Sequence, residues 1–189
     1  IHCELTYRGH DYVPFASVSD RFQSTAVTCV SPSKAFNIAG LQIANIVAAD
    51  AEVRKKIDKA ININEVCDVN PFGVIATIAA YNEGEEWLDD LRKYLYGNYL
   101  ELREWFGTNY PQYPVTELEG TYLVWVDFRS TGLSSEQLEA LFLEKGKVWL
   151  NEGTMYGAAG DGFMRINIAC PRSRMRVGLE RIGMALGSL

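Results

Sequence analysis

Lys34 is the residue of this chain whose type and surroundings best suit covalent chemistry. It lies in residues 31–40, just after an apolar run, with Ser31 three positions before it and Ser33 directly before it. A lysine amine that loses its proton attacks carbonyl carbon, so lysine is the usual Schiff-base residue. Two hydroxyls and the amides of a tight loop can also bind a phosphate group close to that amine.

Together these residue types predict a site for pyridoxal 5'-phosphate (PLP), a cofactor that carries both an aldehyde and a phosphate. Burial of Lys34 between strands, or a nearby cation, would favour the reactive amine. The alternative for Lys34 is a solvated surface lysine, because most lysines are solvated. The alternative for Ser31 and Ser33 is an ordinary Ser-Pro turn.

Arg165 is the second candidate, because it lies in the middle of an expected strand, between the apolar residues Met164 and Ile166. A guanidinium in such a run needs an acidic partner or an anionic ligand. A substrate carboxylate would fit it in bidentate fashion. The alternative is a structural salt bridge to Asp161 or Glu152.

Residues 157–162 are rich in glycine, but they do not form a dinucleotide fingerprint, which follows a strand and opens a helix. This segment is expected to open a strand instead. We interpret it as a flexible loop whose backbone can approach a ligand. A plain hairpin connection is the alternative.

The elements that must position these residues follow from apolar patterning. Residues 26–30 and 41–49 predict two buried strands, with Lys34 on their connection. Residues 1–7 predict a further strand that ends at a turn over 8–10. Helices are expected over 51–59 and 71–80. A long helix is expected over 85–107, where large apolar residues recur at helical spacing.

The remainder predicts a smaller α+β part. Strands are expected over 121–128, 147–150 and 163–169. Ser134 and Ser135 are suited to capping a helix that runs to about residue 145, and a closing helix is expected over 174–186.

Composition excludes several classes of protein. The chain has 189 residues, of which 48% are hydrophobic, a mean hydropathy of −0.08 and a net charge of −6. It has no basic patch for nucleic acid and no apolar run long enough to span a membrane. The four cysteines form no Cys-x-x-Cys pair, and the chain has two histidines, so no metal site is predicted. Free, buried thiols in a reducing cytoplasm are the expected state.

Several segments, in order along the whole chain, resemble the fold-type I PLP-dependent aminotransferase superfamily (class I/II), and within it the cystathionine β-lyase, or C–S lyase, branch. These segments are residues 1–5, 31–42, 79–88, 119–128 and 163–173. The resemblance implies an α/β fold that corresponds to the C-terminal part of the PLP-dependent transferase fold. Residues 1–84 would belong to the large PLP-binding domain, 85–107 to a long bridging helix and 108–189 to a small α+β domain.

The resemblance also implies roles for single residues. Lys34 matches the Schiff-base lysine that shuttles the Cα proton, and Ser31 matches the phosphate-binding serine, which Ser33 assists. His2 falls where the family places the partner of the cofactor's phenolic oxygen. Arg165 matches the arginine that binds the substrate α-carboxylate.

Two more residues fall in the loop that lines the substrate entrance, Tyr156 and Gly157. One position departs from many aminotransferases, which carry a phosphate-binding arginine where this chain has Gln42, as the lyase branch does. This departure favours the lyase.

The family's aspartate for the pyridinium nitrogen would lie just before Ile1, so the chain is expected to be a C-terminal fragment that binds PLP weakly and is inactive alone. The expected enzyme is a cytoplasmic, homodimeric C–S β-lyase that acts on a small amino acid whose side chain the sequence does not define. The first alternative is an aminotransferase that uses the same lysine. The second is a non-catalytic remnant, or a dimerising or regulatory module.

Overall fold

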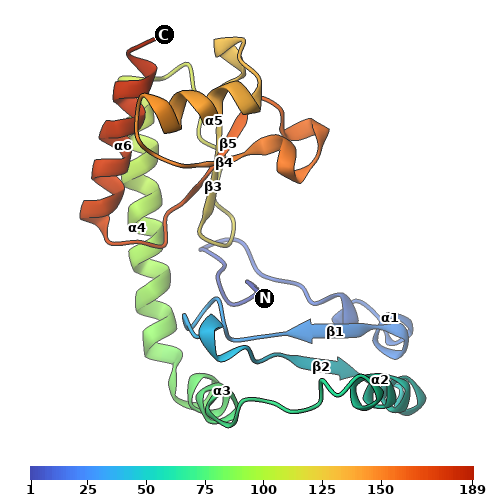
Figure 1. Cartoon of the computed structure of the whole chain (residues 1–189). Coiled ribbons are helices and arrows are strands. Elements are labelled where there is room, and N and C mark those ends of the chain that lie inside the picture. The colour runs from blue at the N-terminus through green and yellow to red at the C-terminus, as the bar shows by residue number, and fades with distance from the viewer. The chain divides into compact units, whose positions relative to one another are not determined.

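Residues 1–189 are described by a computed structural model, and they divide into two units, Ile1–Arg92 and Lys93–Leu189 (Figure 1). The boundary falls inside the longest helix, α4 (Glu85–Asn109). The three-part division at residues 84 and 107 stays a prediction. None of the helices combines the length and the apolarity that crossing a membrane requires.

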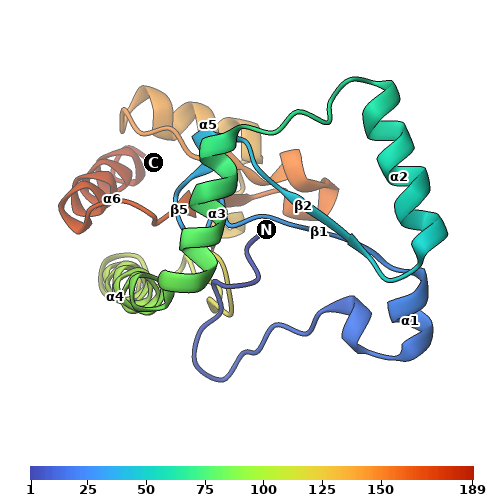
Figure 2. The same ribbon diagram turned by 90° about the horizontal axis from the view of Figure 1, so that it is seen from below.

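The first unit contains one pair of strands with helices around it. Strand β1 (Val27–Val30) pairs antiparallel with β2 (Asn45–Ala48), and the two run side by side in Figure 2. The helices are α1 (Asp20–Thr25), α2 (Ala51–Ile63) and α3 (Pro71–Glu83). Short 3-10 turns cover Phe15–Ser17 and Ala39–Leu41. The segment from 31 to 44, which carries Lys34, therefore connects two paired strands as predicted.

Helix starts in this unit follow from capping chemistry. Asp50 accepts hydrogen bonds from the N–H groups of Glu52 and Val53, which begins α2. Asn70 accepts one from Phe72, and Pro71 occupies the first turn of α3, where it loses no helical hydrogen bond. Both helices extend several residues beyond their predicted ends.

Three expectations for this unit were wrong. The strands are not buried, because Val27, Ile46 and Val47 are each about half exposed. Residues 1–7 form no strand, since the Leu5 N–H bonds back to the His2 carbonyl at 2.9 Å and closes a turn. The thiols are all free, but Cys29 and Cys67 are exposed. Apolar sequence predicted burial in the first case, but the consecutive residues Ile46 and Val47, which point to opposite faces of the strand pair, are both about half exposed.

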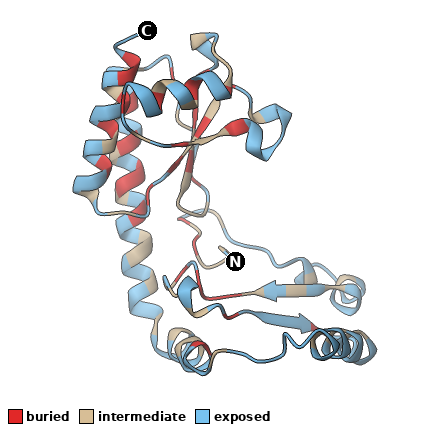
Figure 3. Cartoon of the chain, viewed as in Figure 1, coloured by how far each residue is buried: buried red, intermediate tan, exposed pale blue.

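The second unit is a three-stranded antiparallel sheet packed against helices. Strand β5 (Phe163–Asn167) is central, between β3 (Leu123–Asp127) and β4 (Asn151–Glu152). Alternate residues of β3 and β5 are buried, and Figure 3 shows the buried positions gathered where the sheet meets the helices. These helices are α4, α5 (Ser135–Glu144) and α6 (Arg172–Leu186).

Phe128 lies at the centre of this core. Its ring lies 6.0 Å from that of Phe106 on α4, 5.0 Å from that of Tyr113 and 5.2 Å from that of Phe142 on α5. These four aromatic side chains are buried. Large aromatic side chains contribute heavily to burial free energy, so this cluster joins the loop, the sheet and two helices.

The predicted strand over 147–150 was wrong, since β4 begins only at Asn151. The Val148 N–H bonds to the Phe142 carbonyl at the end of α5, and Lys147 has a φ of 53°, in the left-handed region. This turn uses the backbone groups that a strand would need. The cap of α5 was predicted correctly, with Ser134 and Gln137 forming a capping box.

Candidate active site

The Lys34 turn presents an exposed lysine above buried neighbours. Ser31, Ser33 and Ala35 are 5%, 8% and 0% exposed, whereas Lys34 is exposed. The Ser31 hydroxyl accepts the Ser33 N–H at 3.2 Å and donates to the Ile43 carbonyl at 2.6 Å. The turn is therefore fixed from inside, and the amine lies on its outer side. Lys34 is not buried between the strands.

Helix α3 and the start of α4 hold the far side of the same turn. The Phe36 ring meets Tyr81 edge-on, with 6.1 Å between ring centroids, and Trp87 donates its indole N–H to the Ala35 carbonyl at 3.4 Å. Gly84, between the two helices, lets Phe36 approach closely. Lys34 is thus exposed, but the residues directly before and after it, Ser33 and Ala35, are both buried.

Tyr81 also contacts the turn that contains His2. Its hydroxyl donates to Glu4 Oε1 at 3.5 Å, and Arg92 Nε donates to the Glu4 carbonyl at 2.7 Å. Burial, with the nearby Glu4 carboxyl, raises the pKa of Tyr81. Tyr81 therefore joins the Lys34 turn, through Phe36, to the His2 turn, through Glu4. Sequence reasoning missed this role, although Tyr81 lies in one of the segments that carry the resemblance.

Arg165 lies at the centre of the outer face of the three-stranded sheet. It is paired with Trp125 of β3 on one side and with Asn151 of β4 on the other. Its Nη2 donates to Asn151 Oδ1 at 3.0 Å, and its Cζ lies 4.4 Å from the centre of the Tyr156 ring. Its Nε is buried and has no hydrogen-bond partner. A buried N–H of a cation without a partner is costly, so this atom suits an anionic ligand.

The salt bridges expected as the alternative for Arg165 do not form. Asp161 Oδ1 accepts the N–H groups of Ser135 at 2.9 Å and Gly162 at 3.1 Å. Glu152 Oε2 accepts the N–H of Thr154 at 2.8 Å. Both carboxylates therefore serve local turns, and the guanidinium keeps an unpaired donor.

The glycine-rich segment, residues 157–162, contains one 3-10 turn, Ala158–Gly160, and directly follows another, Gly153–Tyr156. Gly157 and Gly162 have φ values of 122° and 78°, which favour glycine. A Cβ on Gly153 would lie 2.7 Å from the Gly160 carbonyl carbon. The close approach seen here is thus between two parts of the same backbone. The predicted approach to a ligand stays a prediction.

A cavity of about 620 Å³ borders Arg165. It lies between residues 147–151, part of β5 and the following residues, and α6. Its charged lining residues are Lys147, Arg165, Arg174 and Arg181, without an acidic one. This distribution favours anions near Arg165. No group of three or more metal-ligating side chains is arranged to hold an ion.

The predicted site residues form two sets. Lys34, Ser31 and Ser33 share one turn in the first unit, which Tyr81 links to the His2 turn. Arg165 and Tyr156 are in contact in the second unit, and Gly157 follows Tyr156.

Comparison with known proteins identifies the family of this chain. The model of the family "aminotransferase class I and II" matches residues 1–182. The chain belongs to this family. It is 42% identical over 186 residues to the cystathionine beta-lyase PatB of Bacillus subtilis, and the match covers 98% of this chain and 48% of that protein.

Two further relatives show how widely the likeness extends. The crystal structure of cystalysin from Treponema denticola, which contains PLP, matches with a TM-score of 0.95 at 31% identity, covering 100% of this chain and 48% of that one. Aspartate aminotransferase of Pyrococcus horikoshii is 30% identical over 159 residues, covering 82% of this chain and 39% of that protein. The PLP-dependent transferase fold is confirmed. The chain spans about half the length of the curated relatives it matches.

Proposed function

We propose that the enzyme to which this chain contributes is a PLP-dependent C–S β-lyase, which converts a cysteine conjugate into a thiol, pyruvate and ammonia. The observation that supports this most is the 42% identity to a cystathionine beta-lyase, in a match that covers 98% of this chain. Gln42 also favours the lyase, because many aminotransferases are expected to carry an arginine at this position.

The residues around Lys34 fit the cofactor. The lysine is exposed beside two buried serines, and the Ser31 hydroxyl can rotate from the Ile43 carbonyl toward a phosphate oxygen. Ser31 and Ser33 would hold the phosphate, and His2 would lie toward the phenolic oxygen. When bound, PLP supplies an electron sink that stabilises negative charge at the substrate Cα.

Lys34 would perform two tasks at its Nζ. It would hold the aldehyde carbon of the cofactor between turnovers, and it would then accept the Cα proton of the substrate. The packed residues on either side of it limit how far this amine can move. A base fixed near its proton raises the rate through orientation.

Arg165 would bind the substrate carboxylate. Its buried Nε lacks a partner, and the neighbouring lining residues are cationic or neutral. A carboxylate that accepts from this guanidinium would satisfy the Nε and fix the orientation of the Cα–H bond. Tyr156 and Gly157 would border the same part of the substrate.

An aminotransferase that uses the same lysine is the second candidate, and the 30% identity to an aspartate aminotransferase favours it. The two activities differ in their need for an acceptor. We expect release of pyruvate and thiol from a cysteine conjugate without any keto acid. Strict dependence on a keto acid would instead establish the aminotransferase.

Borohydride reduction of the PLP-loaded enzyme, followed by peptide mapping, tests the shared requirement of both activities. The expected result is a pyridoxyl label on Lys34, with none on the exposed control residue Lys55. Absence of label on Lys34 would contradict both enzyme functions and leave the non-catalytic or regulatory module.

We extend the proposal to a homodimer. Helix α3 exposes Phe72, Ile75 and Ile78, which are 72%, 65% and 56% exposed, and a second subunit would cover such an apolar face. Light scattering of the enzyme at micromolar concentration tests this: twice the subunit mass is expected, and a monomer at all concentrations would contradict it.

A further inference from the structure

Two residues of the second unit contact the Arg165 guanidinium, one at its edge and one at its face. Asn151 Oδ1 accepts from Nη2 at 3.0 Å, and the Tyr156 ring lies against the guanidinium, with Cζ 4.4 Å from the ring centre. The buried Nε is the donor that neither contact satisfies. Because a guanidinium is planar, these two contacts determine the direction in which Nε points.

Tyr156 is itself held in place from the sheet. Its ring meets that of Trp125 edge-on, with centroids 5.3 Å apart and an interplanar angle of 89°. Trp125 is the direct cross-strand partner of Arg165. Trp125, Tyr156 and Arg165 therefore support one another on the outer face of the sheet. No hydrogen bond of the Tyr156 hydroxyl is seen, and the side chain is 49% exposed.

The loop that carries Tyr156 is closed at its base. Gly153 and Gly160 approach so closely that a Cβ on Gly160 would lie 2.6 Å from the Gly153 carbonyl carbon. The Ser135 hydroxyl donates to the Gly160 carbonyl at 3.2 Å and accepts the Gly162 N–H at 2.9 Å. Ser135 is completely buried, so this anchor is shielded from water. The two ends of the loop, Gly153 and Gly160, are therefore in close contact, and Tyr156 between them places its ring against the Arg165 guanidinium.

We propose that Tyr156 and Asn151 are positioning residues for Arg165, and that Tyr156 acts through the face of its ring rather than through its hydroxyl. The inference rests on the proposed function, in which Arg165 binds the substrate carboxylate. Asn151 fixes one edge of the guanidinium, Tyr156 fixes its plane, and the Nε–H is left directed at the carboxylate. An aromatic face within about 6 Å of a guanidinium attracts it whether or not the ring carries a hydroxyl.

Equilibrium binding of two amines to the PLP-loaded enzyme isolates the carboxylate. L-Alanine and ethylamine differ by that group alone, and neither has a thiol to eliminate. Their dissociation constants are read from the change in cofactor absorbance. We expect Tyr156→Leu to reduce the preference for alanine over ethylamine by about tenfold, the size of a lost cation–π contact in a partly desolvated site.

Conservative and control variants separate positioning from general damage. Tyr156→Phe is expected to keep the preference within about threefold, because the ring remains. Asn151→Ala is expected to reduce it, which provides a second test if Tyr156→Leu folds poorly. Leu143→Ala, on α5 and also 49% exposed, is the matched control and is expected to leave the preference unchanged.

The outcomes distinguish the two proposals. An unchanged preference in Tyr156→Leu and Asn151→Ala would overturn the positioning role, and an equal loss in Tyr156→Phe and Tyr156→Leu would assign the effect to the hydroxyl instead. A wild-type enzyme whose cofactor absorbance responds to neither amine would instead overturn the proposed function.

Discussion

The ring of Phe36 packs where a side chain on Gly84 would begin: a Cβ built on that glycine would lie 2.5 Å from Phe36 Cε1. Gly84 ends α3 directly before α4 starts, and Phe36 belongs to the Lys34 turn. Because Gly84 has no side chain, the space between the two helices can hold Phe36 and thus the turn that carries Lys34.

Gly84→Ala is expected to destabilise the protein by about 1–3 kcal/mol, because an aromatic ring and the Ala80 carbonyl must both move. Urea unfolding measures this change. Gly107→Ala, on α4, is the control, since no atom lies within 4 Å of the added Cβ. There the better helix propensity of alanine should raise stability or leave it unchanged. Equal effects of the two variants would contradict the packing argument.

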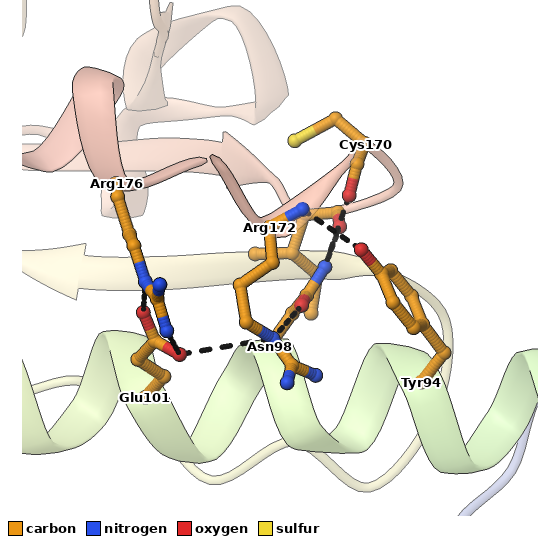
Figure 4. A network of polar contacts seen from close by, with 7 residues as sticks. Tyr94, Asn98, Glu101, Cys170, Arg172 and Arg176 are labelled. Carbon is orange, nitrogen blue, oxygen red and sulfur yellow. Dashed lines mark hydrogen bonds and ion pairs between the residues drawn. The ribbon is translucent and has the colours of Figure 1, made fainter. Parts of the chain in front are cut away.

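A second relationship concerns the buried amide of Asn98 on α4. Its Nδ2 donates to the carbonyls of Ile168 at 3.0 Å and Cys170 at 3.1 Å, and its Oδ1 accepts from Arg172 Nε at 2.9 Å (Figure 4). Tyr94 accepts the backbone N–H of Arg172 through its hydroxyl at 2.8 Å. One helix thus holds the whole turn that connects β5 to α6.

Asn98→Leu is expected to lower the free energy of unfolding by about 2–4 kcal/mol, because two carbonyls lose the donor that the buried amide supplies and the partly exposed Arg172 guanidinium loses one of its acceptors. Chemical denaturation measures the loss. Asn109→Ala on the same helix removes an amide that bonds the Trp105 carbonyl at 2.8 Å in an exposed place. A change below about 0.5 kcal/mol is expected there. A comparable loss in both would refute the assigned role of burial.

The sequence predicted those elements whose signal is local. Apolar residues at helical spacing placed α4, and four of them, Leu95, Tyr99, Leu102 and Phe106, are buried. Ser134 and Ser135 indicated the start of α5, and Ser134 is its N-cap. Strands were less predictable, because pairing depends on a distant partner: residues 147–150 have strand-like composition, but the end of α5 takes the Val148 N–H.

The residues of the candidate site also differ in whether local sequence is enough to predict them. Lys34 and Arg165 could be found from their own neighbours in sequence. The roles of Tyr81 and Asn151 could not, since Tyr81 contacts Glu4 across 77 positions and Asn151 reaches Arg165 only through strand pairing. No local pattern records such contacts. For the same reason the sequence could not exclude a salt bridge from Arg165 to Asp161 or Glu152. In the structure both carboxylates instead accept backbone hydrogen bonds in local turns.

Acid stability should depend on Asp127 at the end of β3. Hydrogen bonds from the Arg129 side chain, the strongest cause, hold the pKa of this carboxyl below its ordinary value of about 3.9. A carboxyl with a lowered pKa in the folded state contributes stability above its unfolded pKa, and this contribution is lost as the pH falls through the folded pKa.

Asp127→Asn is therefore expected to be less stable than wild type at pH 7, and the difference should shrink below about pH 4. Thermal melts at pH 7 and pH 3 measure this. Asp68→Asn, in an exposed loop, is the control and should keep a constant difference from wild type. A difference for Asp127→Asn that persisted unchanged at pH 3 would show that the ion pair does not contribute in this way.

Removal of the Lys34 side chain should separate chemistry from folding. The side chain is exposed and packs into no core, so Lys34→Ala is expected to change the free energy of unfolding by less than about 0.5 kcal/mol. The same variant would lose the nucleophile and base of the proposed function, and its rate of pyruvate release should fall by about 10³-fold or more. Lys55→Ala, at another exposed lysine, which is paired with Glu52, should keep full activity. The surrounding turn is fixed by Ser31 and Phe36 and not by the amine, so binding of the cofactor phosphate should survive in Lys34→Ala. Without the covalent link, PLP should dissociate from this variant on dialysis, and the protein should stay folded. Retained activity, or unfolding on loss of this one side chain, would mean that Lys34 has a structural role in its turn.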